Sequence, residues 1–281
     1  MLVLQQNIQD SLWQPNLSHS YDLSIVVAVH SLLYSISDAQ HRLLIVRSYQ
    51  IQKPAPADEV WAALLAQDGC LSMPYANVSI NYQSPYLVLL PDELYLSEQA
   101  ETYLKHSFAN FAAEQYFVTA TDLLDDKKAV FALPLAWHDC LKKQYPEVVP
   151  QHCTAEWLYY IMQQRTAETH TVYVHVHERQ VQIAVCGRAE KLLFFSQYQF
   201  LAATDFLYYV LLAYQTLGLD TATVALKLSG ELLAASEIYE LLQKYVQNID
   251  FLPPPAWLTL GAAFDGLPMQ IFMDAVVVSS K

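Results

Sequence analysis

The sequence predicts an α/β fold in which one β-β-β-α-β-α unit occurs twice along the chain. The stretches VAVHS (27–31) and VHVHE (174–178) each end an apolar, β-branched run at a histidine and precede a second apolar run, about half the chain apart. In addition, 54% of the 281 residues are hydrophobic and only 15% are charged, against roughly 25% charged in an average domain. The chain therefore needs extensive two-sided burial or a partner that covers apolar surface.

The first half begins with a predicted antiparallel meander. Its strands are expected at 23–29, 32–37 and 42–51, separated by turn residues. A helix follows, with Asp58 as its N-cap and Gly69 at its end, because Pro54 and Pro56 stop the preceding strand. Further strands are predicted at 86–91, 116–123, 129–135 and 148–153, and further helices at 97–111, 136–146 and 154–165.

The second half repeats this order. Strands are expected at 171–178, 180–187, 191–200, 222–230 and 248–253, and helices at 203–217, 236–246 and 256–264. The last apolar stretch, 271–278, fits a strand or a helix. We therefore predict a first lobe over residues 1–165, with 1–21 peripheral, and a second lobe over 166–281.

Charge and composition exclude several classes of function. The net charge is −13 and Lys and Arg are not clustered beyond two short pairs, so nucleic acid and anionic membranes are poor partners. No apolar run is long enough to span a bilayer, and the N-terminus lacks a signal-peptide pattern. We expect a cytoplasmic protein without membrane insertion. The four cysteines are scattered, which predicts buried thiols and not disulfides or a zinc site.

Glycine is unusually rare. The chain has 6 glycines, whereas average usage of about 7% would give roughly 20. Backbone loops that hold phosphate need closely spaced glycines, because the chain must approach the anion and adopt positive φ. Neither a G-x-G-x-x-G nor a Walker loop is possible with these positions.

Few residues are candidates for chemistry. His175 and His177 share one strand face and, with His30, could bind a transition metal, although turn or core histidines are the favoured interpretation. Ser229 is not in a G-x-S-x-G context. We therefore expect no catalytic residue, no metal site and no cofactor. Aromatic residues crowd into 194–214 and indicate either a doubly buried element or a partner surface.

The duplicated unit resembles the actin-like ATPase (ribonuclease H-like) superfamily, whose two lobes surround a cleft. VALKLSGEL (224–232) resembles the adenosine-site strand of that superfamily, LGAAF (260–264) its late G-A-A segment, and VVPQHCTAEWLYYI (148–161) its connection between lobes. Within the superfamily, the chain is most similar to a Bacteroidetes family of proteins of unknown function. That family has an "LSI" strand near its start, as at 23–25, and an "LP…F" segment near its end, as at 267–272.

The resemblance also implies where a nucleotide would bind, and the chain departs from the pattern there. The two D-x-G phosphate turns of the superfamily correspond to His30-Ser31-Leu32 and His177-Glu178-Arg179, and the adenosine turn keeps Ser229-Gly230 but continues with Glu231. If anything binds in the cleft, these are the candidate residues: His30, Ser31, His177, Glu178, Ser229 and Gly230. An imidazole is a poor Mg²⁺ ligand, and a carboxylate repels a triphosphate.

These departures predict a catalytically inactive actin-like scaffold or protein-binding module, which binds a protein partner or associates with itself. Two alternatives remain open. One is an ATP-dependent phosphotransferase or ATPase of the same fold with atypical ligands. The other is a small-ligand binder that uses the cleft between the lobes.

Overall fold

The structure is a computed structural model that describes residues 2–123, 126–164, 170–187 and 192–277. The chain forms two compact units, and each is described by itself. The first comprises the described residues of Met1–Glu156 and Ala256–Asp265, and the second comprises those of Trp157–Pro255 and Gly266–Val277. The lobe boundary predicted after residue 165 falls among residues 165–169, outside the described part of the chain, and stays a prediction.

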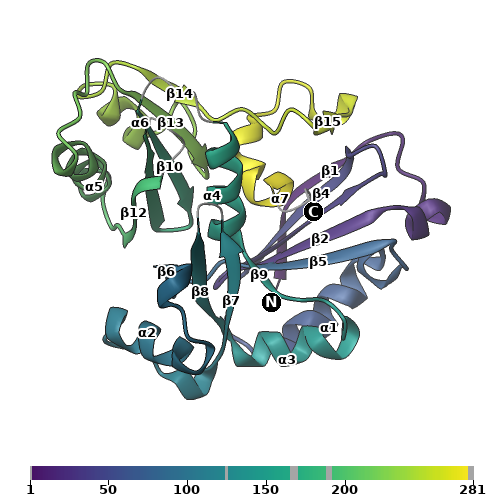
Figure 1. The fold of residues 1–281 in the computed structure, drawn as a ribbon. Coiled ribbons are helices and arrows are strands. Elements are labelled where there is room, and N and C mark those ends of the chain that lie inside the picture. The colour runs from purple at the N-terminus through teal and green to yellow at the C-terminus, as the bar shows by residue number, and fades with distance from the viewer. Residues whose placement is uncertain (1, 124–125, 165–169, 188–191, 278–281) are drawn as a thin grey trace. The chain divides into compact units, whose positions relative to one another are not determined.

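The first unit is built on a mixed sheet with the strand order β1-β4-β3-β2-β5-β9, and β15 adds to the end of β4 (Figure 1). Strands β1 to β4 pair antiparallel, whereas β5 runs parallel to β2 and β9 runs parallel to β5. The strands are β1 (Leu2–Gln9), β2 (Asp22–Val27), β3 (Ser31–Ser37), β4 (Arg42–Ile51), β5 (Asn77–Tyr82), β9 (Gln151–His152) and β15 (Thr259–Leu260).

A separate antiparallel sheet belongs to the same unit, with the order β6-β8-β7. Its strands are β6 (Leu87–Pro91), β7 (Tyr116–Leu123) and β8 (Lys127–Pro134). Helix α2 (Ala100–Ser107) buries Leu104 against this sheet and so covers an apolar face of the sheet. Helices α1 (Ala57–Gln67) and α3 (Leu135–Gln144) pack against each other.

The second unit contains one five-stranded sheet with the order β12-β11-β10-β13-β14. Its strands are β10 (Thr171–His177), β11 (Gln180–Cys186), β12 (Leu192–Gln199), β13 (Ala225–Gly230) and β14 (Ile249–Phe251). Its helices are α5 (Ala203–Thr216), α6 (Glu237–Leu242) and α7 (Met273–Val277), and the division between the units falls within α4 (Cys153–Gln163). Ser236 caps α6 as the sequence predicts, accepting a hydrogen bond from Tyr239 N at 3.3 Å.

Short 3-10 helices complete the described elements. They are Pro15–Ser20, Gly69–Ser72, Asp92–Leu94, Ser97–Gln99, Ala113–Gln115, Ala262–Phe264 and Met269–Phe272. No helix in the described ranges has both the length and the apolar character needed to cross a bilayer.

The two larger sheets share one topology. With β1 and β15 left aside, the strands of the first sheet can be numbered one to five along the chain, as can those of the sheet in the second unit. In both sheets, neighbouring strands then follow the order 3-2-1-4-5, which is β4-β3-β2-β5-β9 in the first unit and β12-β11-β10-β13-β14 in the second. The fourth strand is parallel to the first in both units. The predicted duplication is therefore confirmed, with one correction. The fourth strand of the first unit is β5, which the sequence analysis missed, whereas the predicted strand 86–91 lies in the separate sheet.

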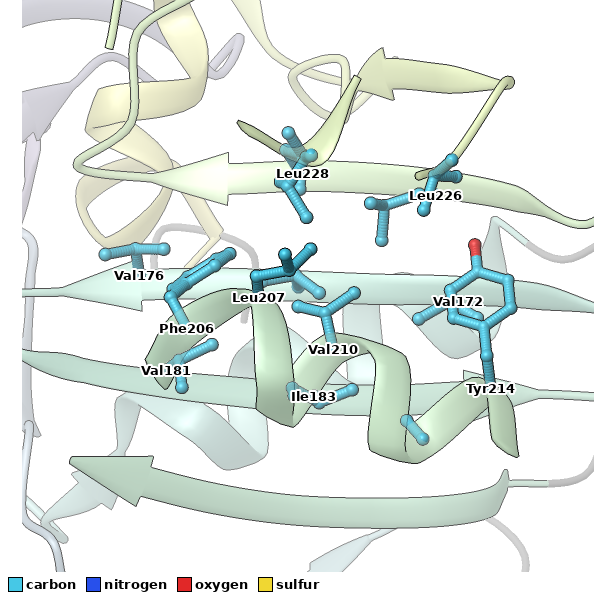
Figure 2. Packing of buried hydrophobic residues seen from close by; sticks show 14 of the residues in the cluster. Val172, Val176, Val181, Ile183, Phe206, Leu207, Val210, Tyr214, Leu226 and Leu228 are labelled. Atoms are coloured by element: carbon cyan, nitrogen blue, oxygen red, sulfur yellow. The ribbon is translucent and has the colours of Figure 1, made fainter. Parts of the chain in front are cut away.

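The core of the second unit explains the strongly apolar strand sequences. Val172, Val174 and Val176 of β10 are fully buried, as are the facing residues of α5. Figure 2 shows α5 lying across this sheet, with Phe206, Val210 and Tyr214 packed on the strands. Every residue of β10 is buried, including His175 and His177 on the opposite face, and burial on both faces accounts for the largely apolar strand sequence.

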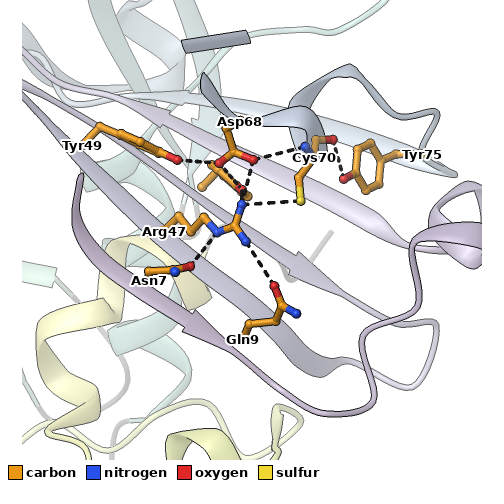
Figure 3. A network of polar contacts seen from close by, with 8 residues as sticks. Asn7, Gln9, Arg47, Tyr49, Asp68, Cys70 and Tyr75 are labelled. Atoms are coloured by element: carbon orange, nitrogen blue, oxygen red, sulfur yellow. Dashed lines mark hydrogen bonds and ion pairs between the residues drawn. The ribbon is translucent and has the colours of Figure 1, made fainter. Parts of the chain in front are cut away.

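A buried polar network fixes the first unit (Figure 3). Asp68 accepts hydrogen bonds from Tyr34 Oη at 2.6 Å, Tyr49 Oη at 2.5 Å and Arg47 Nη1 at 2.7 Å. Arg47 also donates to Asn7 and Gln9 on β1. The edge strand β1 is thereby tied to β4, so the segment predicted to be peripheral contributes a strand.

Two local predictions differ from the structure, and one that was left open is decided. Residues 256–264, predicted as a helix, form β15 and a 3-10 turn because β15 pairs with β4. Asp58 lies in the first turn of α1, and Pro56 occupies the N-cap position. The stretch 271–278, left open in the sequence, contains α7.

The predicted state of the cysteines is confirmed. All four, Cys70, Cys140, Cys153 and Cys186, are free and buried.

Candidate functional site

Three of the residues singled out in the sequence come together on β10 and β13. His175 and His177 lie two residues apart on β10, so their side chains share one face of the sheet. Strand β13 runs parallel beside β10 and places Ser229 opposite His175 in register. All three residues are buried. The H-x-H spacing and the adenosine-site resemblance thus point to one location in the second unit.

Helix α7 supplies an acid that the sequence analysis did not single out. Asp274 Oδ1 lies 3.0 Å from His175 Nε2, and Asp274 Oδ2 lies 3.0 Å from His177 Nδ1. One carboxylate therefore bridges two imidazoles. We call Ser229, His175, Asp274 and His177 the histidine–aspartate cluster. The signal in the sequence was a lone acid in the apolar stretch FMDAVVV, because a buried charge needs a partner.

The cluster stabilises its own charges. Burial by itself would lower the pKa of His177, but the hydrogen bond to Asp274 and the charges of Asp274, Glu231 and Glu178 raise this pKa to about 9. Burial would also raise the pKa of Asp274, but the charges of His175 and His177 and their hydrogen bonds hold it far below its usual range. His177 and Asp274 therefore form a buried ion pair at neutral pH.

Ser229, His175 and Asp274 contact one another in the order of a catalytic triad, but the Ser229 hydroxyl is buried. Ser229 Oγ lies 3.0 Å from His175 Nδ1, accepts from Trp157 Nε1 at 3.2 Å and contacts Val174 O at 3.3 Å. Its exposed fraction is 0%. A nucleophile must reach a substrate carbonyl, whereas this hydroxyl contacts only His175, Trp157 and Val174 among the described residues that form hydrogen bonds with it.

The turn between β10 and β11 carries the second set of predicted residues. Glu178 adopts a left-handed φ of 53°, and its backbone N–H donates to Glu231 Oε2 at 2.9 Å. Gly230 has a φ of 86°, and a Cβ there would lie 1.9 Å from Val176 O. Glycine is therefore required at this crossing, and the chain continues so that the Glu231 carboxylate reaches the turn.

The first predicted phosphate turn, His30-Ser31-Leu32, belongs to the first unit. The carbonyl of His30, an exposed residue, accepts a hydrogen bond from Ile51 N at 2.7 Å, and Ser31 begins β3. None of the residues of this described turn has a positive φ. His30 and Ser31 thus lie in one unit and the other candidates in the second.

The metal alternative gains no support from side-chain geometry. Within the part of the chain that the structure describes, no group of three or more His, Cys, Asp and Glu side chains is arranged to hold a metal ion. In the cluster, both oxygens of Asp274 face imidazole nitrogens, so the histidines serve as partners of a carboxylate.

Solved structures confirm the predicted fold. A Bacteroides thetaiotaomicron protein with an actin-like ATPase fold and unknown function matches with a TM-score of 0.75 at 20% identity, covering 86% of this chain and 94% of that chain. A chain of the PilM–PilN type IV pilus biogenesis complex matches with a TM-score of 0.59 at 13% identity, covering 92% and 97%. No curated protein sequence matches this chain.

The comparison by sequence family agrees with the resemblance noted above to Bacteroidetes proteins of unknown function. Since a family model described as "Protein of unknown function (DUF3822)" matches residues 10–249, the chain belongs to this family.

Proposed function

We propose that this protein is a catalytically inactive member of the actin-like fold that acts as a scaffold, binding another protein or a second copy of itself. One observation carries the first part of the proposal. The backbone N–H of Glu178, in the turn that the fold would use for phosphate, is bonded to the carboxylate of Glu231. An internal anion thus occupies a donor that a phosphate would need.

The charges around this turn oppose phosphate binding as well. Glu178, Glu231 and Asp274 all act on His177, whose single positive charge is already paired with Asp274. A triphosphate brought to this turn would face carboxylates without a free cation from the cluster. The buried hydroxyl of Ser229 offers no alternative chemistry.

The protein-binding part of the proposal is supported by apolar surface on the second unit. Leu201, between β12 and α5, is 82% exposed, and Tyr208, within α5, is 61% exposed. Tyr208 contacts Tyr209, which in turn stacks on Tyr198 at 4.2 Å. Exposed aromatic residues on a rigid base favour contact with another protein. Of the structural neighbours, the PilM–PilN match is itself named as a complex.

Thermal unfolding with and without Mg·ATP tests the inactive state. A ligand at a hundred times its dissociation constant stabilises a protein by about 2.7 kcal/mol, which raises a melting temperature by several degrees. We expect no change in the melting temperature and no phosphate release. Stabilisation by Mg·ATP with phosphate release above the buffer rate would instead establish the phosphotransferase alternative.

Light scattering across protein concentration and affinity capture test the scaffold. We expect either self-association or a retained partner, and we expect Leu201→Ser and Tyr208→Ser to weaken it. The matched control is Leu94→Ser, an exposed leucine of the first unit. A strictly monomeric protein that retains no partner would contradict the scaffold, whatever the result with Mg·ATP.

A further inference from the structure

A cavity of about 100 Å³ lies in the first unit, beyond the carboxyl ends of β2 and β5. Val27 ends β2, Val29 follows it, and Gln83 follows the last residue of β5. Tyr116 and Pro134, from β7 and β8, complete the wall. In open α/β sheets, the carboxyl ends of parallel strands are the usual place for a ligand.

Gln83 lines this cavity with a side-chain amide that has no hydrogen-bond partner among the described residues. Its backbone N–H donates to Val27 O at 2.8 Å, which fixes the residue at the end of β2. The side chain is buried, since the residue is only 6% exposed, and neither Oε1 nor Nε2 has a hydrogen-bond partner within the described ranges. An unpaired buried amide destabilises a fold, so its presence at a cavity points to a bound group.

Apart from Gln83 and Ser84, whose Oγ accepts a hydrogen bond from Tyr86 N at 3.2 Å, the side chains of the wall are apolar or aromatic, and none is charged. Tyr86 packs edge-on against Tyr116 with ring centres 4.9 Å apart. Burial, together with a hydrogen bond to Tyr86, raises the pKa of Tyr116 to about 12, so its hydroxyl is uncharged. As far as the structure describes the chain, no Asp, Glu, Lys, Arg or His lines this cavity.

We propose that this cavity binds a small, uncharged ligand that carries a carboxamide or lactam group. The ligand N–H donates to Gln83 Oε1, and the ligand C=O accepts from Gln83 Nε2. A carboxylate or an ammonium group would lose its hydration without a counter-ion, and a ketone would leave Gln83 Oε1 unpaired. The volume is below the roughly 150 Å³ of an apolar cavity that holds benzene, so a compound of few heavy atoms fits.

None of the four residues of the histidine–aspartate cluster lines this cavity, and the proposal is tested independently of the scaffold. Three probes of nearly equal size distinguish its chemistry. Propionamide has the donor and the acceptor, butanone has only the acceptor, and propionate is charged. Titrations of the full chain, followed by ligand-observed nuclear magnetic resonance, should give saturable binding of propionamide at least about tenfold tighter than that of butanone. Propionate should not bind.

Variants locate the binding. Gln83→Leu should abolish the preference for propionamide over butanone. Gln182→Leu is the matched control, because Gln182 of the second unit is also a buried amide without a partner in the described residues, and it does not line this cavity. Val29→Phe, at a position that is 57% exposed at the cavity rim, should weaken propionamide binding without disturbing the core.

Several results would overturn the proposal. These are equal binding of propionamide and butanone, unchanged propionamide binding in both the Gln83→Leu and Val29→Phe variants, and a crystal soaked in propionamide with only water on Gln83. If Gln83→Leu does not fold, the Val29→Phe variant and the three probes still decide the matter.

Discussion

At the scale of single residues, His177 and Asp274 show how burial and charge compete. The pKa of His177 is raised from an ordinary 6.5 to about 9 in spite of its burial. A group whose pKa rises on folding contributes stability that is fully present below its unfolded pKa and is lost as the pH rises through its folded pKa. The stability from His177 is therefore complete below about pH 6.5 and lost through about pH 9.

We predict that the free energy of unfolding of the wild-type protein falls between pH 6.5 and 9 relative to that of His177→Gln. The difference is on the order of 3 kcal/mol, because each pKa unit corresponds to about 1.4 kcal/mol. Urea denaturation at several pH values measures it. His106→Gln is the control, since His106 is exposed on α2. Parallel pH profiles for wild type and His177→Gln would contradict the buried ion pair.

Gly230 gives a second prediction at this scale. A Cβ at Gly230 would overlap Val176 O at 1.9 Å, and its φ is positive. We expect Gly230→Ala to destabilise the protein by several kcal/mol, or to prevent folding, because backbone has to move. Gly218 has a similar φ of 62° but nothing within 4 Å. Gly218→Ala should therefore cost only about 1 kcal/mol. Similar losses of melting temperature for the two variants would show that the close crossing is not required.

The sequence predicted some of these residues for a physical reason that the structure supports. Alternation along a strand places His175 and His177 on one face whatever the tertiary fold is. Asp274 was not predicted, because it reaches the cluster from a helix 97 residues after His177, and no local pattern encodes such a distance. The carboxylate of Glu231 was recognised as unfavourable to phosphate, but its bond to the Glu178 amide depends on the turn geometry.

At the scale of elements, the Asp68 network joins strands β3 and β4 to the end of α1. Arg47 and Tyr49 come from β4, Tyr34 from β3, and Asp68 follows α1 directly. The hydrogen bonds and the charge of Arg47 overcome burial and lower the pKa of Asp68. The carboxylate is thus kept ionised inside the unit, and its stabilising contribution is lost only as the pH falls into the acid range.

We predict that Arg47→Leu destabilises the protein by roughly 3–5 kcal/mol, because it leaves the buried Asp68 carboxylate without its cation. Urea denaturation near neutral pH measures the loss. The matched control is Lys105→Ala, which removes an exposed ion pair with Glu101 on α2 and should change the stability by less than about 1 kcal/mol. Equal effects of the two substitutions would mean that the network does not hold the sheet together.

Element boundaries were predictable where a segment contains its own signal. Ser236 was predicted to cap α6 and does so, and the apolar periodicity of α5 predicted that helix. The segment 256–264 was predicted as a helix because its composition favours one, whereas pairing of β15 with β4 determines the outcome. Tertiary pairing overrides local propensity in such short segments. Strand β5 was missed because NVSINY contains few strongly apolar residues.

At the scale of the whole molecule, the duplication was the most predictable feature. Each unit repeats three antiparallel strands, a helix and a parallel strand, and the hydrophobic runs mark these strands in order. The extra sheet β6-β8-β7 was not separable in sequence, since its strands have the same alternation as the others. The sequence also carries no local signal that residues 256–265 belong to the first unit and residues 266–277 to the second.

The late position of these two segments in the chain has a consequence for folding during synthesis. The first unit requires β15, and the second requires α7 with Asp274, so both are completed by residues after Pro255. During synthesis, a growing polypeptide exposes both sheets before either has its last strand or helix. Neither unit is complete until residues 256–277 have been synthesised and have left the ribosome, although domains ordinarily mature one after another from the amino terminus. Until those residues are available, both sheets expose apolar surface and strand edges, the features that make a folding intermediate prone to aggregate.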